Sequence, residues 1–285
     1  MTSSPFTMLM PIYHGDNIAF VRDAYRSATT DQTLPPTYVV IVVDGPVSND
    51  LSQWVEEVSE EPGVTVIRLP QQNGLANALN VGLKQVTTPL VARADADDIS
   101  LPQRFAIQIP MLESGLDVVG SAIAEFDDDP DRVQAIRTVY TTQEAIAEHA
   151  RLACPFYHPS VAFRREAVLR NGGYPSLPHM EDYLLWARMI MHGAKLGNSP
   201  EVLVHYRVGS GAYARRGGAE MARSEARLQR QFLAMHFVTR WQYMRNRIVR
   251  GGLYRLMPVV PRQFVYRLWM RLLRRGGQGL HNLAE

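Results

Sequence analysis

Three carboxylates lie within four positions at Asp95, Asp97 and Asp98. They directly follow Leu90-Val91-Ala92-Arg93, whose apolar start is typical of a buried strand. Carboxylates this close repel one another unless a cation or solvent lies between them. A divalent metal, which takes oxygen ligands from aspartates and from the phosphates of a substrate, would account for all three. A solvated acidic turn before the next helix would account for them too, so this stretch alone leaves two hypotheses.

The elements before these carboxylates alternate between strands and helices. Strands are predicted over residues 6–13, 38–43, 64–69 and 90–93, and helices over residues 17–28, 51–59 and 73–84. This alternation predicts an α/β fold with a parallel, doubly wound sheet and right-handed crossovers. Open sheets of this kind bind ligands at the carboxyl ends of their strands. Tyr13, Asp44 and the segment before Asn73 are therefore expected to share a crevice with Asp95 and Asp97, which favours the ligand-site hypothesis.

Beyond the carboxylates the pattern is less regular. Two capping boxes are predicted to open helices, at Ser100 with Gln103 and at Thr141 with Glu144. Two strands and a helix are also predicted, over residues 117–126, 158–163 and 181–192. Glu181 and Asp182 begin this last helix, where the helix dipole favours negative charge, so capping alone could explain them. The acidic run of residues 127–131 lacks the spaced ligands of a calcium loop and is expected to be a solvated turn.

Composition narrows the possible functions. A chain of 285 residues with 46% hydrophobic and 20% charged residues can bury a sizeable globular core. Neither a G-x-G-x-x-G fingerprint nor a P-loop follows the first strand, which argues against a nicotinamide dehydrogenase and a P-loop kinase. The single Cys154 cannot form an internal disulfide and is expected to be a small buried hydrophobe. Without a signal-like segment or a run of about 20 apolar residues, a cytoplasmic protein is expected.

An ordered set of short motifs runs through residues 6–216. The motifs are Met10-Pro11-Ile12-Tyr13, Val43-Asp44-Gly45-Pro46, Asn73-Gly74-Leu75, Asn80-Val81-Gly82, Arg93 to Asp98, Pro102 with Arg104 and Gln108, His158-Pro159-Ser160, Gly172-Gly173-Tyr174 and Glu181-Asp182-Tyr183. In order and spacing they resemble the family 2 glycosyltransferases with the GT-A nucleotide-sugar fold. A looser resemblance points to bacterial exopolysaccharide and surface-glycan transferases of the amylovoran-biosynthesis type. The fold class implied is α/β, a Rossmann-like, mostly parallel central sheet flanked by helices.

The resemblance implies a donor site at the end of the first strands. Backbone around Pro11 and Tyr13, together with Asp44, would hold the uracil of a UDP-sugar. Asp95 would face the ribose, and Asp97 would bind Mn²⁺ or Mg²⁺ on the diphosphate. Such a metal offsets the charge that develops on the departing UDP, as a Lewis acid.

The resemblance also implies an acid–base residue. Asp182 would be the general base, taking a proton from the acceptor hydroxyl as it attacks the anomeric carbon in one inverting displacement. Glu181 could exchange roles with it. His158 could orient the acceptor or Asp182, or it could be structural. On the donor side Asn73 is a further candidate, while Arg93 could pair with the local carboxylates or reach the diphosphate.

One departure from the resembled pattern concerns the metal. Many relatives carry a histidine shortly after a Tyr-Arg pair, whereas Tyr206-Arg207 is followed by Val208-Gly209-Ser210. His205 precedes the pair and is the candidate substitute ligand. Arg215 and Arg216, beside two glycines, could close over the diphosphate through bidentate contacts or form a solvated basic loop.

The end of the chain is strongly basic. From Arg215 to Arg275 there are fifteen arginines and only two acidic residues, and aromatic side chains such as Phe232, Phe237 and Trp241 lie between them. This composition suits the surface of an anionic membrane. Nucleic-acid binding competes as an explanation but is disfavoured by the resemblance, because such transferases commonly meet a lipid-diphosphate-linked acceptor. Packing on the core or on another subunit, as in a homo-oligomer, is the third explanation.

The sequence thus predicts a catalytic domain over residues 1–220 and a basic helical extension over residues 221–285. The expected function is an inverting, metal-dependent transfer of a hexose from a UDP-sugar to a lipid-linked or oligosaccharide acceptor in surface-glycan assembly. The expected location is peripheral, at the inner face of the cell membrane. A transferase using a GDP- or dTDP-sugar, and a catalytically silent nucleotide-sugar or glycan-binding module, are the alternatives.

Overall fold

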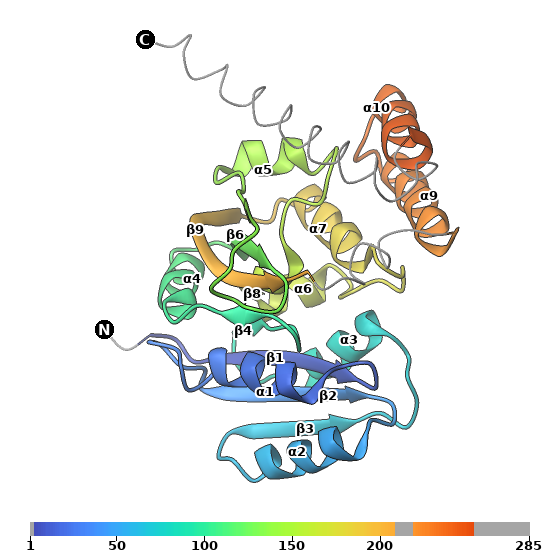
Figure 1. Ribbon diagram of the computed structural model, residues 1–285. Coiled ribbons are helices and arrows are strands. Elements are labelled where there is room, and N and C mark those ends of the chain that lie inside the picture. Colours follow the sequence, from blue (N-terminus) through green and yellow to red (C-terminus); the bar gives the residue numbers. More distant parts are fainter. Residues whose placement is uncertain (1–2, 209–218, 254–285) are drawn as a thin grey trace. The chain divides into compact units, whose positions relative to one another are not determined.

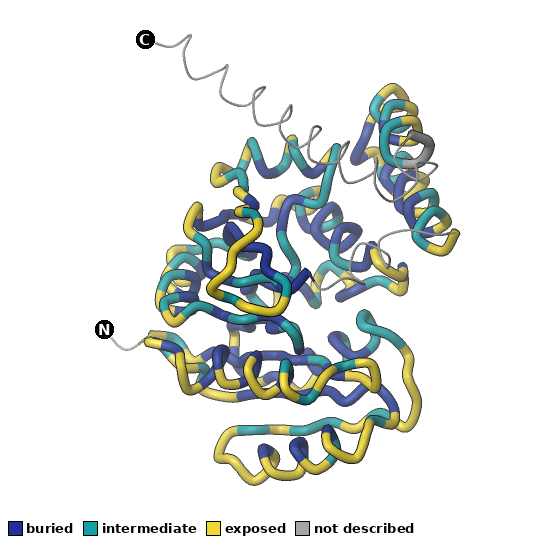
Figure 2. The backbone as a smooth tube through the Cα atoms, viewed as in Figure 1, coloured by how far each residue is buried: buried dark blue, intermediate teal, exposed yellow. Residues whose placement is uncertain are grey.

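The computed structural model describes residues 3–208 and 219–253 (Figure 1). The chain divides into two compact units, Met1–Gly209 and Ser210–Glu285. Each unit is described by itself. In the first unit the central strands are largely buried, whereas the edge strand over residues 64–68 and the outer faces of the helices carry exposed residues (Figure 2).

The first half of the first unit follows the predicted order. Its elements are β1 (Phe6–Tyr13), α1 (Ile18–Ser27), β2 (Tyr38–Asp44), α2 (Asn49–Ser59), β3 (Val64–Arg68), α3 (Leu75–Gln85) and β4 (Leu90–Arg93). The four strands pair in parallel in the order β3-β2-β1-β4. Val39 and Ile41 of β2 pack in the core cluster with α1 and α2, whereas Val40 and Val42 pack in the cluster with α3. Both faces of β2 are covered, which explains its unbroken apolar run.

The second half turns the sheet into a mixed one. Its elements are β5 (Ile99–Ser100), α4 (Arg104–Glu113), β6 (Val118–Phe126), β7 (Ala135–Arg137), α5 (Gln143–His149), η1 (His158–Ser160), β8 (Ala162–Arg164), α6 (Arg165–Arg170), α7 (Glu181–Met191) and β9 (Leu196–Arg207). Strand β8 lies antiparallel to β4, and the sheet continues through β6, β9 and β5, with β7 paired to β6. The result is a mixed α/β fold with a curled central sheet flanked by helices. The predicted α/β fold class is confirmed, and the parallel part expected from the first alternation is β1 to β4, whereas the sheet beyond them contains antiparallel pairs as well.

Three local predictions are wrong for identifiable reasons. Ser100 caps no helix, because it lies in β5 and pairs with Val204 of β9, and α4 begins at Arg104. Helix α5 is capped by Thr142, whose hydroxyl accepts from the backbone N–H of Ala145 at 3.4 Å, instead of by Thr141. The expected strand over residues 158–163 is a 3-10 turn followed by the shorter strand β8.

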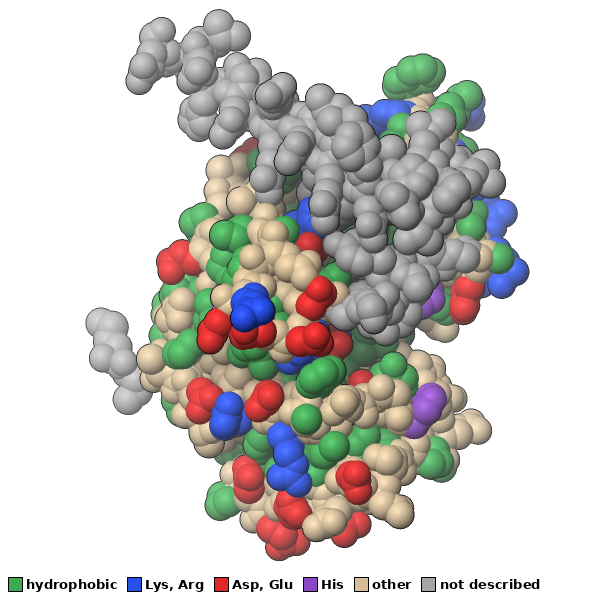
Figure 3. Space-filling model, in the orientation of Figure 1, with side chains coloured by type: hydrophobic (Ala, Val, Ile, Leu, Met, Phe, Trp, Pro, Cys, Tyr) green, Lys and Arg blue, Asp and Glu red, His purple; other side chains and the backbone are tan. Residues whose placement is uncertain are grey.

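Several exposed arginines of the first unit form ion pairs with nearby acidic residues. Arg22 pairs with Glu57 at 3.2 Å, and Arg26 pairs with Asp31 at 3.3 Å. On the face that Figure 3 shows, basic side chains of this unit stand next to acidic ones. In the second unit the exposed positions include five arginines, namely Arg223, Arg227, Arg230, Arg240 and Arg247.

The second unit is helical, with α9 (Ala219–Ala234), α10 (Arg240–Asn246) and the π-helical segment η2 (Arg247–Leu253). Its interior is polar as well as apolar. Arg250 pairs with Glu225 at 2.8 Å, and both residues belong to a hydrogen-bonded chain that continues through Gln229 and Asn246.

The large apolar residues of this unit include both buried and exposed ones. Phe232 and Phe237 are buried and pack edge to face with ring centroids 4.9 Å apart, so they belong to the interior. Trp241, Met244 and Ile248 are 75%, 55% and 61% exposed. None of the described helices is both long enough and apolar enough to span a bilayer.

Candidate active site

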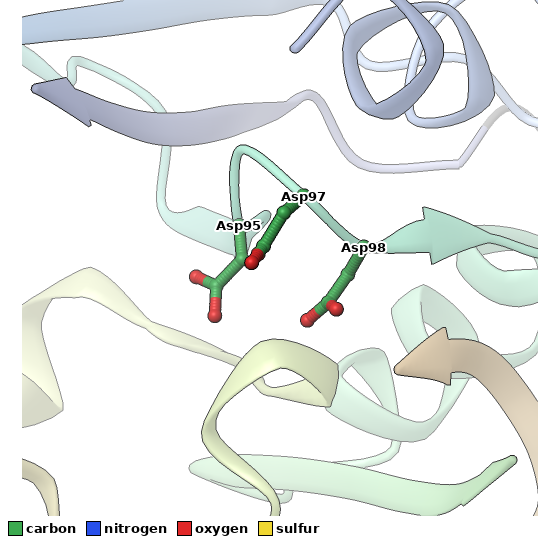
Figure 4. A group of neighbouring side chains, drawn as sticks. All are labelled: Asp95, Asp97 and Asp98. Carbon is green, nitrogen blue, oxygen red and sulfur yellow. The ribbon is translucent and has the colours of Figure 1, made fainter. Parts of the chain in front are cut away.

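The turn after β4 brings three carboxylates together. Ligand oxygens of Asp95, Asp97 and Asp98 all lie within 4.8 Å of one another, and Figure 4 shows the three side chains on the same side of the turn. Asp95 and Asp97 are half-buried and Asp98 is buried. We call this group the aspartate cluster. Among residues 3–208 and 219–253, it is the one set of three or more acidic, histidine or cysteine side chains close enough to hold a metal ion.

The surroundings of the Asp98 carboxylate show whether a cation would fit the aspartate cluster. Its Oδ1 accepts from the backbone N–H of Arg207 at 2.8 Å, but its buried Oδ2 has no partner in the described part of the chain. Burial, and then the charges of Asp97 and Asp95, raise the pKa of the Asp98 carboxyl well above its usual range. A divalent cation bound to these oxygens would supply the missing partner and offset the repulsion, so the cluster fits a metal.

A buried arginine, Arg104, binds the backbone at the end of β4. Arg104 donates to the Arg93 carbonyl at 2.7 Å, to Ser100 Oγ at 2.9 Å and to Gln108 Oε1 at 3.1 Å. Gln108 in turn donates to the carbonyl of Ser160 at 2.7 Å. Burial lowers the pKa of the Arg104 guanidinium to about 9. The motif residues Arg104 and Gln108 therefore support the strand end that carries the aspartate cluster.

A second arginine ties the cluster to the end of β9. Besides the backbone contact with Asp98, Arg207 donates through Nε to the Asp97 carbonyl at 2.9 Å and through Nη1 to the Asp127 carbonyl at 3.1 Å. Its guanidinium lies 3.8 Å from the ring centroid of Phe20 and 4.5 Å from that of Phe126. Arg207 is thus a structural clamp between the cluster and the acidic run that begins at Asp127.

The predicted donor-binding residues lie at the same edge of the sheet. Tyr13 and Asp44 are partners across β1 and β2, and Pro11 lies two residues earlier on β1. Both Asp44 oxygens accept backbone N–H bonds of 2.8 Å, from Asn73 and from Gly74 at the start of α3. Asp44 therefore positions α3, and its contact with uracil stays a prediction.

Sequence reasoning missed a fourth carboxylate near the cluster. Asp16 follows β1 and accepts from the backbone N–H of Tyr13 at 2.8 Å. Burial raises the pKa of Asp16 to about 7, the bond from Tyr13 opposes this shift, and the charges of Asp97 and Asp95 add to it. A single aspartate in a loop carries no local signal of this role, but its place at the end of β1 puts it at the ligand-binding edge.

Glu181 and Asp182 begin α7, as predicted. Asp182 Oδ1 accepts from the backbone N–H of Tyr183 at 2.7 Å, and the Cys154 thiol lies 3.5 Å from Asp182 Oδ2. Burial raises the pKa of Asp182, and burial together with the Asp182 charge raises the pKa of Glu181 to about 7. Cys154, expected to be merely a small hydrophobe, is half-buried and contacts a candidate catalytic carboxylate.

Arg93 connects the two acidic groups. Its guanidinium is 3% exposed and pairs with Asp95. Its charge also opposes the rise in the pKa of Asp182 and of Glu181, so it lies near both. His158 Nε2 lies 3.2 Å from the Tyr174 hydroxyl, and burial, followed by the charge of Arg93, lowers the pKa of His158 well below its usual range. The structure thus brings His158, Arg93, the aspartate cluster and the start of α7 into one region.

The remaining predicted contributors are His205, Arg215 and Arg216. His205 is absent from the aspartate cluster, and its ring packs 6.2 Å from that of Phe126. Burial lowers the pKa of His205, and the Pro130 carbonyl and the Asp131 charge oppose this shift. A role for His205 as a metal ligand stays a prediction. Arg215 and Arg216 lie outside the described residues.

The raised pKa of Asp98 gives a prediction about stability. Without metal, ionising this carboxyl destabilises the folded chain as pH rises from the unfolded pKa near 4 through the raised folded pKa. Asp98→Asn removes this cost and keeps an oxygen for the Arg207 N–H. We expect D98N to unfold at higher urea concentration than wild type at pH 7.5 in EDTA, with the difference shrinking toward pH 4.

With added Mn²⁺, wild type should be more stable than D98N, because the ion binds three carboxylates in wild type and only two in the variant. Asp23→Asn on the exposed surface of α1 is the control and should change little under either condition. A less stable D98N in EDTA at pH 7.5 would contradict the proposed charge repulsion.

The chain is similar in sequence to known glycosyltransferases. The family model described as glycosyl transferase family 2 matches residues 7–173. The amylovoran biosynthesis glycosyltransferase AmsE of Erwinia amylovora is 34% identical over 92% of this chain and 97% of its own length. An Escherichia coli UDP-Gal:alpha-D-GlcNAc-diphosphoundecaprenol beta-1,3-galactosyltransferase is 32% identical over 93% of this chain and 96% of its own length.

Solved structures show the same fold at low sequence identity. S. aureus TarS 1-349 in complex with UDP-GlcNAc superposes with a TM-score of 0.66 and 15% identity, covering 86% of this chain and 72% of that one. The mannosyltransferase PcManGT from Pyrobaculum calidifontis, in complex with GDP-Man and Mn²⁺, superposes with a TM-score of 0.63 and 17% identity, covering 98% and 81%. Since the family model matches more than half of its residues and its relatives align along nearly all of it, this chain belongs to glycosyl transferase family 2.

Proposed function

We propose that the chain is an inverting, metal-dependent hexosyltransferase that uses a UDP-sugar and acts in the assembly of a surface glycan. The observation that carries this proposal is the arrangement around Arg93. Arg93 pairs with Asp95 of the aspartate cluster, and its charge also acts on Asp182, so both groups lie near it. A direct displacement needs these two charges on opposite sides of the transferred sugar, one at the leaving group and one at the attacking hydroxyl.

The donor would bind at the carboxyl ends of the strands. Pro11, Tyr13 and Asp44 are proposed to hold the uracil and Asn73 to flank it, while Asp95 faces the ribose. Asp97 and Asp95 would hold Mn²⁺ or Mg²⁺ against the diphosphate, where the ion supplies Lewis-acid stabilisation of the leaving UDP. The bound UDP-GlcNAc of TarS and the Mn²⁺ of PcManGT support this assignment through their shared fold.

Asp182 is proposed as the general base. Its pKa is raised above that of an ordinary aspartate and is therefore closer to neutrality, which suits proton abstraction near pH 7. Its Oδ1 is held by the backbone of α7, and Oδ2 has only the weak contact from the Cys154 thiol. The attack by the acceptor hydroxyl breaks the bond to UDP in one step, and the anomeric configuration inverts.

The acceptor is proposed to be lipid-linked or an oligosaccharide. The E. coli relative is named for a diphosphoundecaprenol-linked acceptor. A chain with such an acceptor would work at the inner face of the cell membrane, and the arginines of the second unit suit an anionic surface. A GDP-sugar donor is the second candidate, favoured by the GDP-Man bound in PcManGT.

The nucleotide site is tested by calorimetric titration of UDP, with and without Mn²⁺, into wild type and Asp97→Ala. We expect metal-dependent binding in wild type and a loss of at least about tenfold in affinity in the variant, because one of the carboxylate ligands of the ion is gone. Arg22→Lys on the surface of α1 is the control and should bind like wild type. Binding of GDP or dTDP in place of UDP would contradict the proposed UDP-sugar donor. If no nucleotide binds, the proposed transferase activity is contradicted.

The base is tested by Asp182→Asn. We expect kcat to fall about 10²- to 10⁴-fold while the Kd of UDP stays within a factor of about three, because the carboxylate acts on the acceptor. In wild type, kcat should fall as pH is lowered through the raised pKa of Asp182, since only the ionised carboxylate takes a proton. Glu181→Gln is the matched control, and a larger loss in it than in D182N would assign the base to Glu181.

The membrane proposal is tested on the exposed side chains Trp241 and Ile248. We expect the full chain to co-sediment with phosphatidylglycerol vesicles, and Trp241→Ser to weaken this binding at least about tenfold, because about 1.5–3 kcal/mol of apolar burial is lost. Gln231→Ser, at an exposed polar position of α9, is the control. Equal binding by wild type, W241S and I248S would contradict docking through these residues.

A further inference from the structure

Arg93 carries two hydrogen-bond donors that lack a partner within residues 3–208 and 219–253. Its guanidinium is 3% exposed, Nη2 pairs with Asp95, and Nε and Nη1 are buried and unpaired. Leaving donors of a charged group unsatisfied away from water costs about 1–3 kcal/mol or more each. Buried polar groups in folded proteins are nearly always paired, so these two atoms indicate a partner that is not part of the described chain.

The position of Arg93 indicates where that partner lies. Ala92 and Ala94 pack in the core cluster with α1 and α2, whereas Val91 packs in the cluster that contains Tyr174 and Trp186. Because side chains alternate along a strand, Arg93 projects to the same face as Val91, the face covered by α3 and α7. There its charge acts on Asp182, Glu181 and His158, while its Nη2 holds Asp95.

We propose that Arg93 is a specificity-determining residue whose unpaired donors, Nε and Nη1, bind hydroxyl oxygens of the transferred hexose. This inference rests on the proposed function, in which the sugar lies between the leaving diphosphate and the base. Arg93 contacts the aspartate cluster and lies near the base, so a hexose held there is within reach of its free donors.

Charge favours a hydroxyl of the sugar over an anionic group. Arg93 is already surrounded by the carboxylates of Asp95, Asp98, Glu181 and Asp182. A further anion at Nε and Nη1 would be repelled by these four groups, whereas a neutral hydroxyl oxygen accepts the bonds without adding charge. The substrate class assigned to this position is therefore an uncharged hexose with a hydroxyl directed at Arg93.

The experiment compares wild type with Arg93→Lys, using UDP, UDP-glucose, UDP-galactose and their N-acetyl and monodeoxy analogues. Lysine keeps the positive charge beside Asp95 but has a single terminal donor group in place of the guanidinium. Arg22→Lys makes the same chemical change at an exposed ion pair and serves as the control. The shift in melting temperature produced by UDP with Mn²⁺ shows for each variant that the fold and the nucleotide site are intact.

Wild type is expected to use one monodeoxy analogue about 10- to 100-fold less efficiently than its parent sugar, by kcat/KM, because that analogue leaves the donors of Arg93 unpaired. The kcat/KM of R93K on the parent sugar should be lower than that of wild type by a similar factor. In R93K the kcat/KM values for the parent sugar and for the deoxy analogue should differ by no more than about threefold. The Kd of R93K for UDP with Mn²⁺ should stay within about threefold of wild type.

Three results would overturn the assignment. A loss of UDP affinity in R93K equal to its loss of kcat/KM would place Arg93 on the diphosphate. If R93K discriminates against the deoxy analogue as strongly as wild type does, the hydroxyl contact is excluded. It is also excluded if wild type uses every deoxy analogue as efficiently as the parent sugar. A wild-type chain that binds UDP with Mn²⁺ but transfers no hexose would refute the proposed function, and the sugar contact with it.

Discussion

Crowded negative charge is the constraint on which the first unit depends. Asp95, Asp97 and Asp98 meet at the end of β4, Asp16 approaches from β1, and the Glu181–Asp182 pair begins α7. Left alone, these carboxylates would favour the unfolded chain, where solvent separates them. The arginines around them offset the repulsion in different ways. Arg93 pairs with a carboxylate, while Arg104 and Arg207 bind the carbonyls of the backbone that carries the cluster.

Much of this arrangement could be predicted from the sequence where local patterns are strong. The β-branched run of β2 and the regular alternation of β1 to β4 are properties of neighbouring residues, and they place Asp44, Asp95 and Asp97 at one edge. Strand β9 could not be found in this way. Its sequence contains Gly197 and Pro200, and the structure accommodates Pro200 and Glu201 by a register shift opposite Ser121 and Ala122.

The remaining errors come from interactions between distant segments. Ser100 has the spacing of a cap, but pairing with β9 makes it part of a strand, so tertiary contacts override the local motif. The unpaired donors of Arg93 and the proximity of Asp16 to Asp97 depend on the whole fold and leave no trace in spacing. In the basic end, composition suggested a common role for all the aromatics, whereas Phe232 and Phe237 form an interior and Trp241 faces outward.

The bond between the Arg207 amide and Asp98 spans 109 positions of the chain, and this separation has a consequence for synthesis. During translation the strands β1 to β4, with all three aspartates, leave the ribosome long before β9 does. Until β9 docks, the turn after β4 lacks both the amide for Asp98 and the guanidinium that holds the Asp97 carbonyl. Contacts between distant segments form late, because closing a long loop is costly in entropy. A nascent chain therefore carries the acidic residues before the contacts that shape the aspartate cluster have formed, and the cluster is complete only when the sheet is.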